Sequence, residues 1–175
     1  MKTTGVVRRV DELGRIVIPK EIRKTLRLKD GESVEIFLDN NDIILKKHSP
    51  LEDLGNFYQN YVSSIQNVIG KNIFIVDRDK IVAVAGDLKK KYFEQKISSN
   101  IDQMIRASTT VIKNEEEIIY LTEELNEQAY FVLAPIIING DAIGAVILLS
   151  IDKKIDEFEI KTITIAAKFL GKYIE

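Results

Sequence analysis

The sequence predicts an α+β protein with a small N-terminal part, residues 1–49, and a larger C-terminal part, residues 50–175. The first observation is charge. Residues 1–29 hold nine basic and three acidic side chains, a balance of +6, although the whole chain has a formal net charge of −2. The second observation is periodicity, because residues 72–150 contain short β-branched runs between tight turns, and helical spacing flanks them. This mixture of antiparallel strands and separate helices is typical of the α+β class.

The composition excludes several classes of protein. Of the 175 residues, 45% are hydrophobic and 30% are charged, so the chain is neither fibrous nor disordered. It has no cysteine, which excludes disulfides and thiolate metal sites and favours a reducing cytosol. The N-terminus lacks the apolar run of a signal peptide, and no stretch approaches the roughly 18 apolar residues of a membrane span. We therefore expect a cytoplasmic protein that uses no membrane, metal or cofactor.

The N-terminal part has the pattern of two hairpins separated by a helix. The predicted elements are strands at residues 5–10 and 15–18, a helix at 19–27, and strands at 33–38 and 43–47. Gly14 can adopt a positive φ in the turn at residues 11–14. Pro19 ends the second strand because it cannot donate to a ladder, and it suits the first position of a helix. Asp30 and Gly31 stop that helix.

A unit of this size is too small to be stable by itself. Ordering costs about 1.5 kcal/mol per residue, and so short a segment buries too little apolar surface to offset the cost. A disulfide cannot supply the missing stability, and His48 is the one available imidazole ligand. We therefore expect that the N-terminal part is an obligate dimer.

Basic side chains gather in the first hairpin and the helix. One helix face carries four of them, at the spacing i, i+3, i+4 and i+7: Lys20, Arg23, Lys24 and Arg27. Like charges at this spacing repel, so the arrangement favours an anionic partner. Arg8, Arg9 and Arg15 lie on the hairpin, and a guanidinium can bridge phosphates or pair bidentately with guanine. A twofold dimer would match the symmetry of duplex DNA. The alternative is a solvated surface on an unrelated dimer.

The segment TGVVRRVDELGRIVIPKEIRKTL, followed by ESVEIFL and DIILKK, resembles the swapped-hairpin DNA-binding domain of the AbrB-like transition-state regulators of spore-forming bacteria. The resemblance implies that two chains interleave their hairpins into one β-barrel domain that binds double-stranded DNA. The DNA-binding residues expected on this basis are Arg8, Arg15, Arg23, Lys24, Arg9 and Lys20. The first three match the family's DNA-contacting arginines. Lys24 stands where close relatives often have arginine, so a phosphate contact is expected there.

The C-terminal part begins with a capping-box pattern at Ser49, Pro50 and Glu52. The helix after it has apolar residues at heptad spacing: Leu51, Leu54, Tyr58, Tyr61, Ile65 and Val68. That spacing favours pairing with another helix. Further apolar residues at Phe57, Val62 and Ile69 widen the stripe and favour packing on the protein's own sheet, so both alternatives stay open.

The remaining elements complete a helix-flanked antiparallel sheet. Strands are predicted at residues 72–77, 80–85, 116–121, 129–138 and 142–150, with tight turns at 77–80 and 139–141. Residues 90–106 have irregular helical spacing, with an inward face at Ile97, Ile101, Met104 and Ile105. The last 20 residues predict an amphipathic helix, whose apolar positions include Ile155, Phe158, Ile165, Phe169 and Tyr173.

This order of elements resembles a GAF domain. The resemblance implies a role in sensing small molecules or in association, with a regulatory pocket between the sheet and residues 90–112 for an unknown effector. The two terminal helices could pair with those of another chain and join two dimers into a tetramer. With both domains together, the chain resembles regulators that activate or repress genes in the developing spore.

Two other classes of function are weaker. Glu115, Glu116 and Glu117 cluster, but adjacent strand residues alternate faces, and His48 follows a strand end, so we expect no enzyme. An antitoxin-like interaction protein of the AbrB fold is the other alternative. It would have a disordered toxin-wrapping tail, whereas this chain continues into a compact domain. The sequence therefore predicts a regulator of transcription that binds double-stranded DNA selectively.

Overall fold

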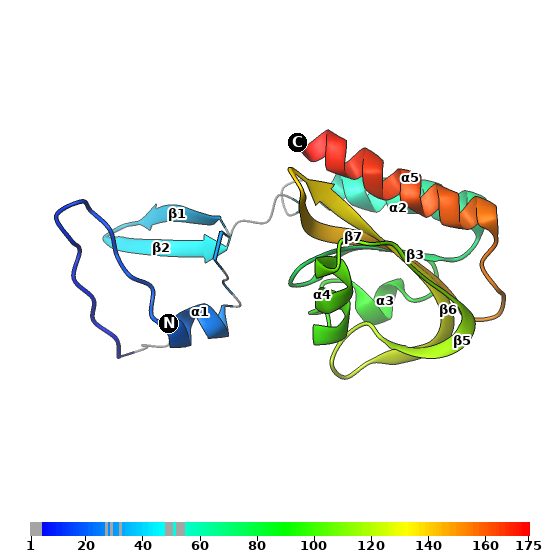
Figure 1. The fold of residues 1–175 in the computed structure, drawn as a ribbon, viewed down its shortest axis with the longest axis horizontal. Coiled ribbons are helices and arrows are strands. Elements are labelled where there is room, and N and C mark those ends of the chain that lie inside the picture. The colour runs from blue at the N-terminus through cyan, green and yellow to red at the C-terminus, as the bar shows by residue number, and fades with distance from the viewer. Residues whose placement is uncertain (1–4, 27, 29, 32, 48–50, 52–54) are drawn as a thin grey trace. The chain divides into compact units, whose positions relative to one another are not determined.

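The computed structural model describes residues 5–26, 28, 30–31, 33–47, 51 and 55–175. The chain divides into two compact units, residues 1–48 and residues 49–175 (Figure 1). Several residues singled out in the sequence lie outside the described ones: Arg27, His48, Ser49, Pro50, Glu52 and Leu54.

The N-terminal unit contains one short helix and one hairpin. Helix α1 spans Lys20–Thr25, and strands β1 and β2 span Val34–Asp39 and Asp42–Lys47. The strands pair antiparallel, with Phe37 opposite Ile44. Asn40 at the tip has a φ of 52°, a left-handed conformation that asparagine tolerates. The prediction of the second hairpin is confirmed.

The first hairpin is present only as a turn. Residues 5–19 form no strand, so the prediction of strands at 5–10 and 15–18 is wrong for a single copy of the chain. The turn itself is closed by two backbone hydrogen bonds, from Gly14 N to the Asp11 carbonyl at 2.9 Å and from Asp11 N to the Arg15 carbonyl at 3.0 Å. Gly14 adopts the expected positive φ of 78°. A strand requires a neighbouring strand, and none of the strands in the described part of the chain pairs with residues 5–19.

Helix α1 is shorter than the predicted residues 19–27. Pro19 has a φ of −57° and a ψ of 148°, so it lies outside the helix as its N-cap rather than at the first helical position. Glu21 lies in the first turn, where the helix dipole favours an acid. The helix ends at Thr25, with Leu26 as its C-cap.

The C-terminal unit is a five-stranded antiparallel sheet between two helical layers. Its elements are α2 (Gly55–Ile69), β3 (Asn72–Asp77), β4 (Ile81–Ala85), α3 (Lys89–Tyr92), α4 (Ser99–Arg106), β5 (Val111–Tyr120), β6 (Asn126–Ile138), β7 (Asp141–Ser150) and α5 (Glu157–Ile174). The strand order is β4-β3-β7-β6-β5. Asn139 and Gly140 form the β6–β7 turn with φ values of 50° and 88°. The α+β prediction is confirmed.

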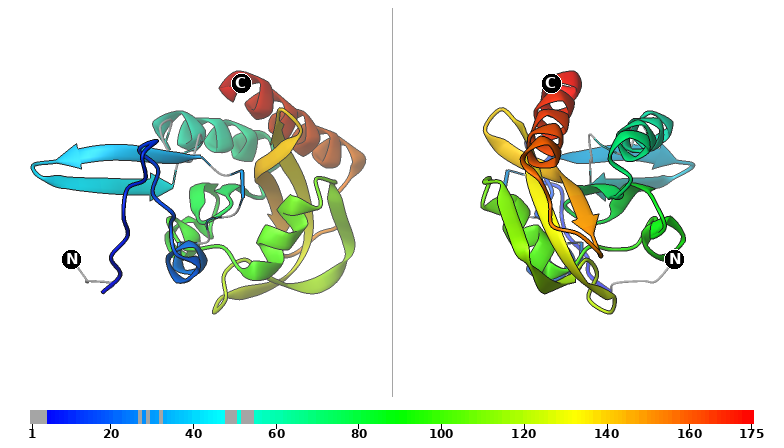
Figure 2. Two further views of the ribbon diagram at one scale, coloured as in Figure 1. Left: turned by 60° about the vertical axis from the view of Figure 1, so that its left-hand side comes forward. Right: turned by 90° about the vertical axis from the view of Figure 1, so that its right-hand side faces the viewer.

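Alternation along the strands produces two cores. Ile73 and Ile75 of β3 face the layer formed by α2 and α5, whereas Phe74 and Val76 face α3 and α4. Figures 1 and 2 show these two helical layers on opposite faces of the sheet. Each face therefore buries its own cluster of apolar side chains.

Helix α2 packs on the sheet of its own unit. Tyr58 and Val62 are fully buried in the cluster between α2, α5 and the sheet. Tyr61 and Ile65 are half-buried, and Val68 at the end of the predicted heptad pattern is exposed. Of the two alternatives for this helix, packing on the sheet accounts for the middle of its apolar stripe and leaves its edges available.

Residues 90–106 form two helices, α3 and α4, rather than one irregular helix. Ser98 begins α4 as its N-cap, and its hydroxyl accepts a hydrogen bond from Ile101 N at 3.1 Å. The inward face is confirmed: Ile97, Ile101 and Ile105 are buried, and Met104 packs beside them. Strand β5 begins at Val111, whereas the sequence predicted a start at residue 116. The prediction missed the first residues because a bulge between Lys113 and Glu117 interrupts the alternation that marks a strand in the sequence.

The amphipathic helix predicted for the last part of the chain is present as α5. Its buried residues are Glu159, Ile163, Ala166, Ala167, Leu170 and Gly171. Of the predicted apolar positions, Ile155 is buried before the helix starts, whereas Phe158, Ile165, Phe169 and Tyr173 are exposed. Small residues face the sheet because the helix approaches it closely. A Cβ atom on Gly171 would lie 2.5 Å from the Ile137 carbonyl oxygen.

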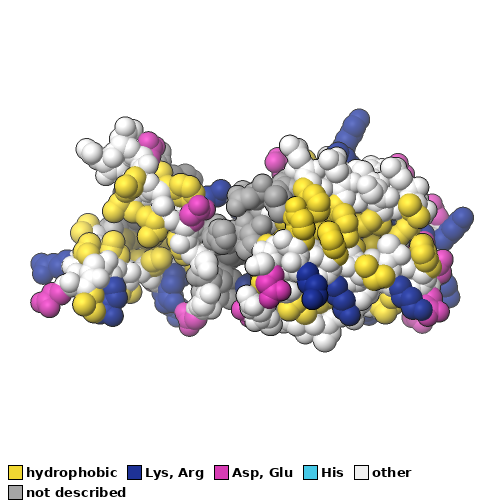
Figure 3. Space-filling model, turned by 90° about the horizontal axis from the view of Figure 1, so that it is seen from above, with side chains coloured by type: hydrophobic (Ala, Val, Ile, Leu, Met, Phe, Trp, Pro, Cys, Tyr) yellow, Lys and Arg dark blue, Asp and Glu magenta, His cyan; other side chains and the backbone are white. Residues whose placement is uncertain are grey.

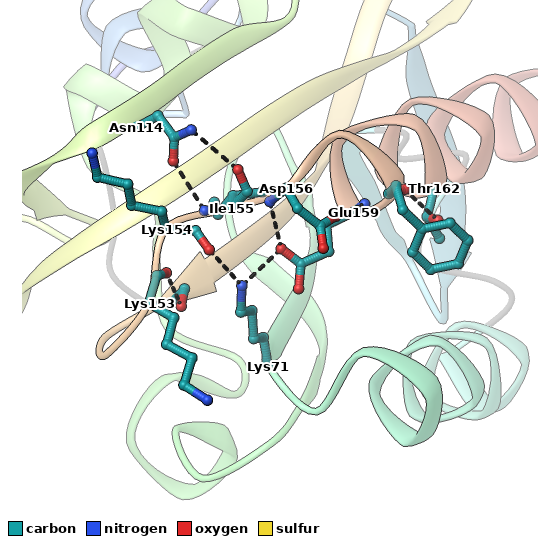
Figure 4. Close-up of polar contacts among 10 residues, drawn as sticks. Lys71, Asn114, Lys153, Lys154, Ile155, Asp156, Glu159 and Thr162 are labelled. Carbon is teal, nitrogen blue, oxygen red and sulfur yellow. Dashed lines mark hydrogen bonds and ion pairs between the residues drawn. The ribbon is translucent and has the colours of Figure 1, made fainter.

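A polar clamp fixes the start of α5 (Figure 4). Lys71, just before β3, donates hydrogen bonds to Glu159 Oε2 at 2.7 Å and to the Lys154 carbonyl at 3.0 Å. Glu159 also forms a capping box with Asp156. Asn114, in the bulge of β5, accepts from Ile155 N at 2.9 Å and donates to the Ile155 carbonyl at 3.1 Å. The clamp therefore sets which face of α5 lies on the sheet and which remains exposed.

Candidate nucleic-acid interface

The six basic residues predicted to contact DNA are all exposed, and they lie on two consecutive segments of the N-terminal unit. Arg8, Arg9 and Arg15 belong to the extended segment that contains the turn at residues 11–14. The other three, Lys20, Arg23 and Lys24, belong to α1. Pro19 joins the two segments, and among the described residues of this unit it alone is buried.

Helix α1 brings three of the cations onto one surface. Lys20, Arg23 and Lys24 follow the spacing i, i+3 and i+4, which places them on neighbouring turns of one face. Arg23 and Lys24 also lie in the last turn, where the helix dipole favours positive charge. If this face contacts a polyanion, the negative charges of the polyanion pair with these cations, so no cation is buried without a partner.

The turn organises the side chain of Arg15. The Asp11 carboxylate accepts hydrogen bonds through Oδ1 from Leu13 N at 3.0 Å and from Arg15 N at 2.8 Å. Its Oδ2 accepts from Arg15 Nε at 2.7 Å. The Arg15 backbone N–H, followed by the Arg15 side chain, holds the pKa of Asp11 below its ordinary value. The Arg15 side chain remains 72% exposed.

Arg23 has a looser acidic neighbour. Its Nη1 lies 3.4 Å from Asp30 Oδ1, and the Asp30 side chain is fully exposed. Arg8 Nη1 donates to the adjacent Val7 carbonyl at 3.1 Å. Sequence reasoning missed the acidic partner of Arg15, which is Asp11, and that of Arg23, which is Asp30. For Asp11 the signal was present, because aspartate at the start of a turn commonly accepts hydrogen bonds from the backbone two or more residues onward.

The apolar side chains of the N-terminal unit have no core in a single copy. Among its described residues, thirteen large apolar side chains are exposed: Val6, Val7, Val10, Leu13, Ile16, Val17, Leu26, Ile36, Phe37, Leu38, Ile43, Ile44 and Leu45. They come from the segment that contains the turn at residues 11–14, from the end of α1 and from both strands of the hairpin. This composition belongs to an interior, so the unit is incomplete without additional surface to cover it.

The layer of α2 and α5 carries a second exposed apolar surface (Figure 3). On α5, Phe158, Ile165, Phe169 and Tyr173 are between 45% and 66% exposed. Aromatic rings of the two helices stack along this surface. Phe57 lies on Tyr173 with ring centroids 4.7 Å apart, and Tyr61 lies on Phe169 with centroids 5.6 Å apart. We call this surface, formed by these six residues, the helical apolar band.

The face predicted to hold a regulatory pocket is filled by side chains. Between the sheet and helices α3 and α4 lie Phe74, Tyr92, Ile97, Ile101, Ile105 and Phe131, each at most 2% exposed. Tyr92 also donates a hydrogen bond to Glu127 of β6 at 2.7 Å, and Lys91 pairs with the same carboxylate at 2.6 Å. Burial, together with this bond, raises the pKa of Tyr92. These contacts tie α3 to the sheet.

None of the helices in the described part of the chain is both long enough and apolar enough to cross a membrane. Likewise, no three acidic, histidine or cysteine side chains among those described are placed to hold a metal ion.

Comparison with protein families divides the chain at residue 53, within a few residues of the boundary between the two compact units. Residues 53–175 match the family described as "Stage V sporulation protein T C-terminal, transcription factor". Residues 7–53 match the family described as "Antidote-toxin recognition MazE, bacterial antitoxin". The two matches follow one another along the sequence, as the two compact units do.

Individual relatives match one or both parts. Stage V sporulation protein T of Bacillus subtilis (strain 168) is 40% identical over 177 residues, which cover all of this chain and 99% of that protein. Transition state regulatory protein AbrB of the same organism is 56% identical over 50 residues, 29% of this chain and 52% of that protein.

Solved structures support the fold of the C-terminal unit. The GAF domain from Acinetobacter phosphoenolpyruvate-protein phosphotransferase is similar with a TM-score of 0.58 and 12% identity, covering 69% of this chain and 81% of that one. The cofactor-binding GAF domain of the nutrient sensor CodY from Clostridium difficile gives a TM-score of 0.52 and 17% identity, covering 89% and 94%. The chain therefore belongs to the stage V sporulation protein T family of transcription factors, with an AbrB-like domain followed by a GAF-like domain.

Proposed function

We propose that this protein binds double-stranded DNA as a dimer through its N-terminal unit and thereby regulates sporulation genes. The observation that carries the proposal is the joint exposure, on one small unit, of six cations and of an apolar surface that needs covering. A second copy that interleaves its own residues 5–18 would cover the apolar surface. It would also bring two sets of cations into a twofold arrangement that matches duplex DNA.

The six cations would make two kinds of contact with DNA. Arg8, Arg15 and Arg23 have planar guanidinium groups that can pair with guanine in the major groove or bridge phosphates. Lys20, Lys24 and Arg9 would contact phosphates. Because phosphate contacts release counterions, the affinity should fall steeply as the salt concentration rises. The protein would act where the chromosome is, in the cytoplasm of the developing spore.

Single substitutions test the placement of the interface. Arg15→Ala and Arg23→Ala should each lower the affinity for a selected duplex by about tenfold or more, because each removes a charged contact to DNA. Fluorescence anisotropy at fixed salt measures the affinity, and sedimentation verifies that the variants assemble like the parent. Lys89→Ala, which removes an exposed cation from the C-terminal unit, is the matched control and should bind like the parent. If both arginine variants also bind like the parent, the interface lies elsewhere.

We further propose that the helical apolar band joins two dimers into a tetramer. The band is contributed by the two terminal helices of the C-terminal unit, and its exposed rings are already aligned by stacking. Pairing with the same band of another copy would bury these rings without reorganising the sheet. Linking two DNA-binding dimers would raise avidity through the effective concentration of the second.

A charge placed in the band tests this association. Phe169→Glu should convert the tetramer into a dimer, since a carboxylate would be desolvated among aromatic rings. Phe93→Glu is the matched control because Phe93 is similarly exposed but follows α3 on the other layer. Sedimentation velocity distinguishes the outcomes. An unchanged tetramer in Phe169→Glu would exclude the band as its interface.

The GAF-like unit would supply regulation by an effector. The space between the sheet and α3–α4 is occupied by buried side chains, so an effector there would have to displace one of these short helices. Such a displacement would strain the bond between Tyr92 and Glu127 that ties α3 to β6. Mass spectrometry of the protein purified under native conditions tests whether a small molecule accompanies it.

One comparison favours a second function for the N-terminal unit. Residues 7–53 match the MazE antitoxin family, whose description names toxin recognition. The match stops where the transcription-factor family begins, and full-length similarity links the chain to stage V sporulation protein T. We therefore propose the regulator over the antitoxin. Reproducible co-purification of a small protein in equimolar amount would reverse that choice.

A further inference from the structure

The turn at residues 11–15 is a closed hydrogen-bonded ring. Backbone bonds link Asp11 and Arg15 in one direction and Asp11 and Gly14 in the other. The Asp11 carboxylate fills the middle of this ring, bonding the N–H groups of Leu13 and Arg15 through one oxygen. All of these contacts lie within five consecutive residues. The turn is therefore formed by one copy of the chain, even though the strands on either side of it are not.

The same carboxylate fixes one edge of the Arg15 side chain. Its second oxygen lies 2.7 Å from Arg15 Nε, a short distance that is typical of a charge-assisted hydrogen bond. A guanidinium engaged at Nε still has the N–H groups of both terminal nitrogens. With 72% of the side chain exposed, these donors are accessible to a ligand. Asp11 thus occupies the Nε donor of the guanidinium and leaves the two terminal nitrogens available for a ligand.

We propose that Asp11 is a positioning residue for DNA recognition, which holds Arg15 so that its two terminal nitrogens present a forked donor pair to the edge of a base. The proposal rests on the proposed function, because it assigns to Arg15 a specific contact within the same interface. A pair of parallel donors matches the O6 and N7 acceptors of guanine in the major groove. Holding the side chain beforehand reduces the rotamer freedom lost on binding.

Arg23 provides an internal contrast. Its acidic neighbour Asp30 lies 3.4 Å away, is fully exposed and forms a single contact with one terminal nitrogen. That pair occupies a donor that a base contact would use, and among the described residues Arg23 has no second acidic partner. We therefore infer that Arg15, rather than Arg23, is the arginine whose geometry is set before DNA arrives.

The charge of Asp11 makes the proposal testable. A carboxylate close to DNA repels phosphates, so a carboxylate without a positioning role should weaken binding, and its removal should strengthen it. Glu12 is the neighbouring exposed acid in the same turn. Asp11→Asn and Glu12→Gln each remove one negative charge from this turn. Asparagine also keeps an oxygen that can accept from Leu13 N and Arg15 N, so the turn can still form.

The experiment measures affinity in the full-length protein for two duplexes. One duplex is enriched by the parent protein from a random-sequence pool, and the other is a scrambled duplex of the same base composition. We expect Asp11→Asn to bind the selected duplex about tenfold more weakly than the parent and the scrambled duplex no more weakly. Glu12→Gln should bind both duplexes as tightly as the parent or more tightly. In an Arg15→Ala background, Asp11→Asn should have no further unfavourable effect on the selected duplex.

An NMR signal of the DNA-free protein adds a readout that does not depend on an affinity measurement. The Arg15 Nε–Hε pair should give a resolved, slowly exchanging NMR signal in DNA-free protein, which Asp11→Asn removes. If Arg15→Ala weakens binding but Asp11→Asn strengthens it as Glu12→Gln does, or if the signal is absent, the positioning role is wrong while the interface stands. If Arg15→Ala itself has no effect, the proposed interface fails and the positioning role fails with it.

Discussion

Asp11 and Arg15 show how a local interaction can position a side chain that we propose to bind DNA. Three donors of the chain converge on one exposed carboxylate: Leu13 N, Arg15 N and Arg15 Nε. Because these bonds stabilise the ionised form, the folded-state pKa lies below the ordinary 3.8. A lowered pKa means that the contribution to stability is present above about pH 3.8 and is lost as the pH falls through the folded value. The Asp11 carboxylate is therefore ionised at the near-neutral pH where DNA binding is measured.

Carboxyl-detected NMR titration checks this arrangement directly. In the parent protein Asp11 should titrate below 3.8. In Arg15→Ala its pKa should rise only part of the way toward that value, because the backbone N–H of residue 15 is the largest cause and survives the substitution. A parent pKa at or above 3.8 would show that the carboxylate does not receive these bonds in solution.

At the scale of elements, the clamp on α5 determines which surface the C-terminal unit presents. The Lys71 and Glu159 side chains are only 14% and 10% exposed, and Asn114 ties the preceding Ile155 to β5. Removing one partner of a nearly buried pair leaves the other charge poorly solvated. By contrast, Lys161 and Glu157 form an equally short pair of 2.6 Å on the exposed side of the same helix.

Lys71→Met should lower the free energy of unfolding by about 2–4 kcal/mol, slightly less than for a fully buried pair because some water reaches both side chains. Lys161→Met, the matched control, should change it by less than about 1 kcal/mol because its pair is solvated. Urea unfolding followed by tyrosine fluorescence measures both values. Equal effects of the two substitutions would show that the clamp does not stabilise the start of α5.

Two hairpins whose strands are joined by short turns were predicted correctly. Strands β6 and β7 are joined by the Asn139–Gly140 turn, and strands β1 and β2 by a turn at Asn40, so alternation and turn residues together located them. The sequence located the apolar positions of α5 but not the face that packs on the sheet, because hydrophobicity ranks Phe158 and Ile165 above alanine and glycine. Close packing reverses the rank, since only small side chains fit where Gly171 meets the Ile137 carbonyl.

The candidate interface was predictable in its residue types and less so in its geometry. Charge and helical spacing identified the cations of α1, and these do share one face. The hold of Asp11 on Arg15 depends on a turn conformation that spacing alone does not specify. Periodicity indicates strands at residues 5–10 and 15–18, but the single chain forms none there, and in the proposed dimer the second copy would supply the missing neighbours.

At the scale of the whole molecule, the proposed function makes association and DNA binding depend on each other. The exposed apolar side chains of the N-terminal unit give a single copy little reason to stay folded. In an obligate dimer, folding of this unit is linked to protein concentration by mass action. The GAF-like unit would then regulate the assembly of dimers into tetramers and would not act directly on the DNA-binding cations.

Amide hydrogen exchange of the full-length protein tests the central claim, that two copies entwine their first hairpins. In the described part of one chain, the amides of residues 6–10 and 16–18 donate to no backbone carbonyl, so they would exchange rapidly in an isolated copy. At concentrations where the protein assembles, our account predicts that these amides are strongly protected. Exchange of both segments at the rate of an unstructured chain, under conditions where the protein binds DNA, would contradict it.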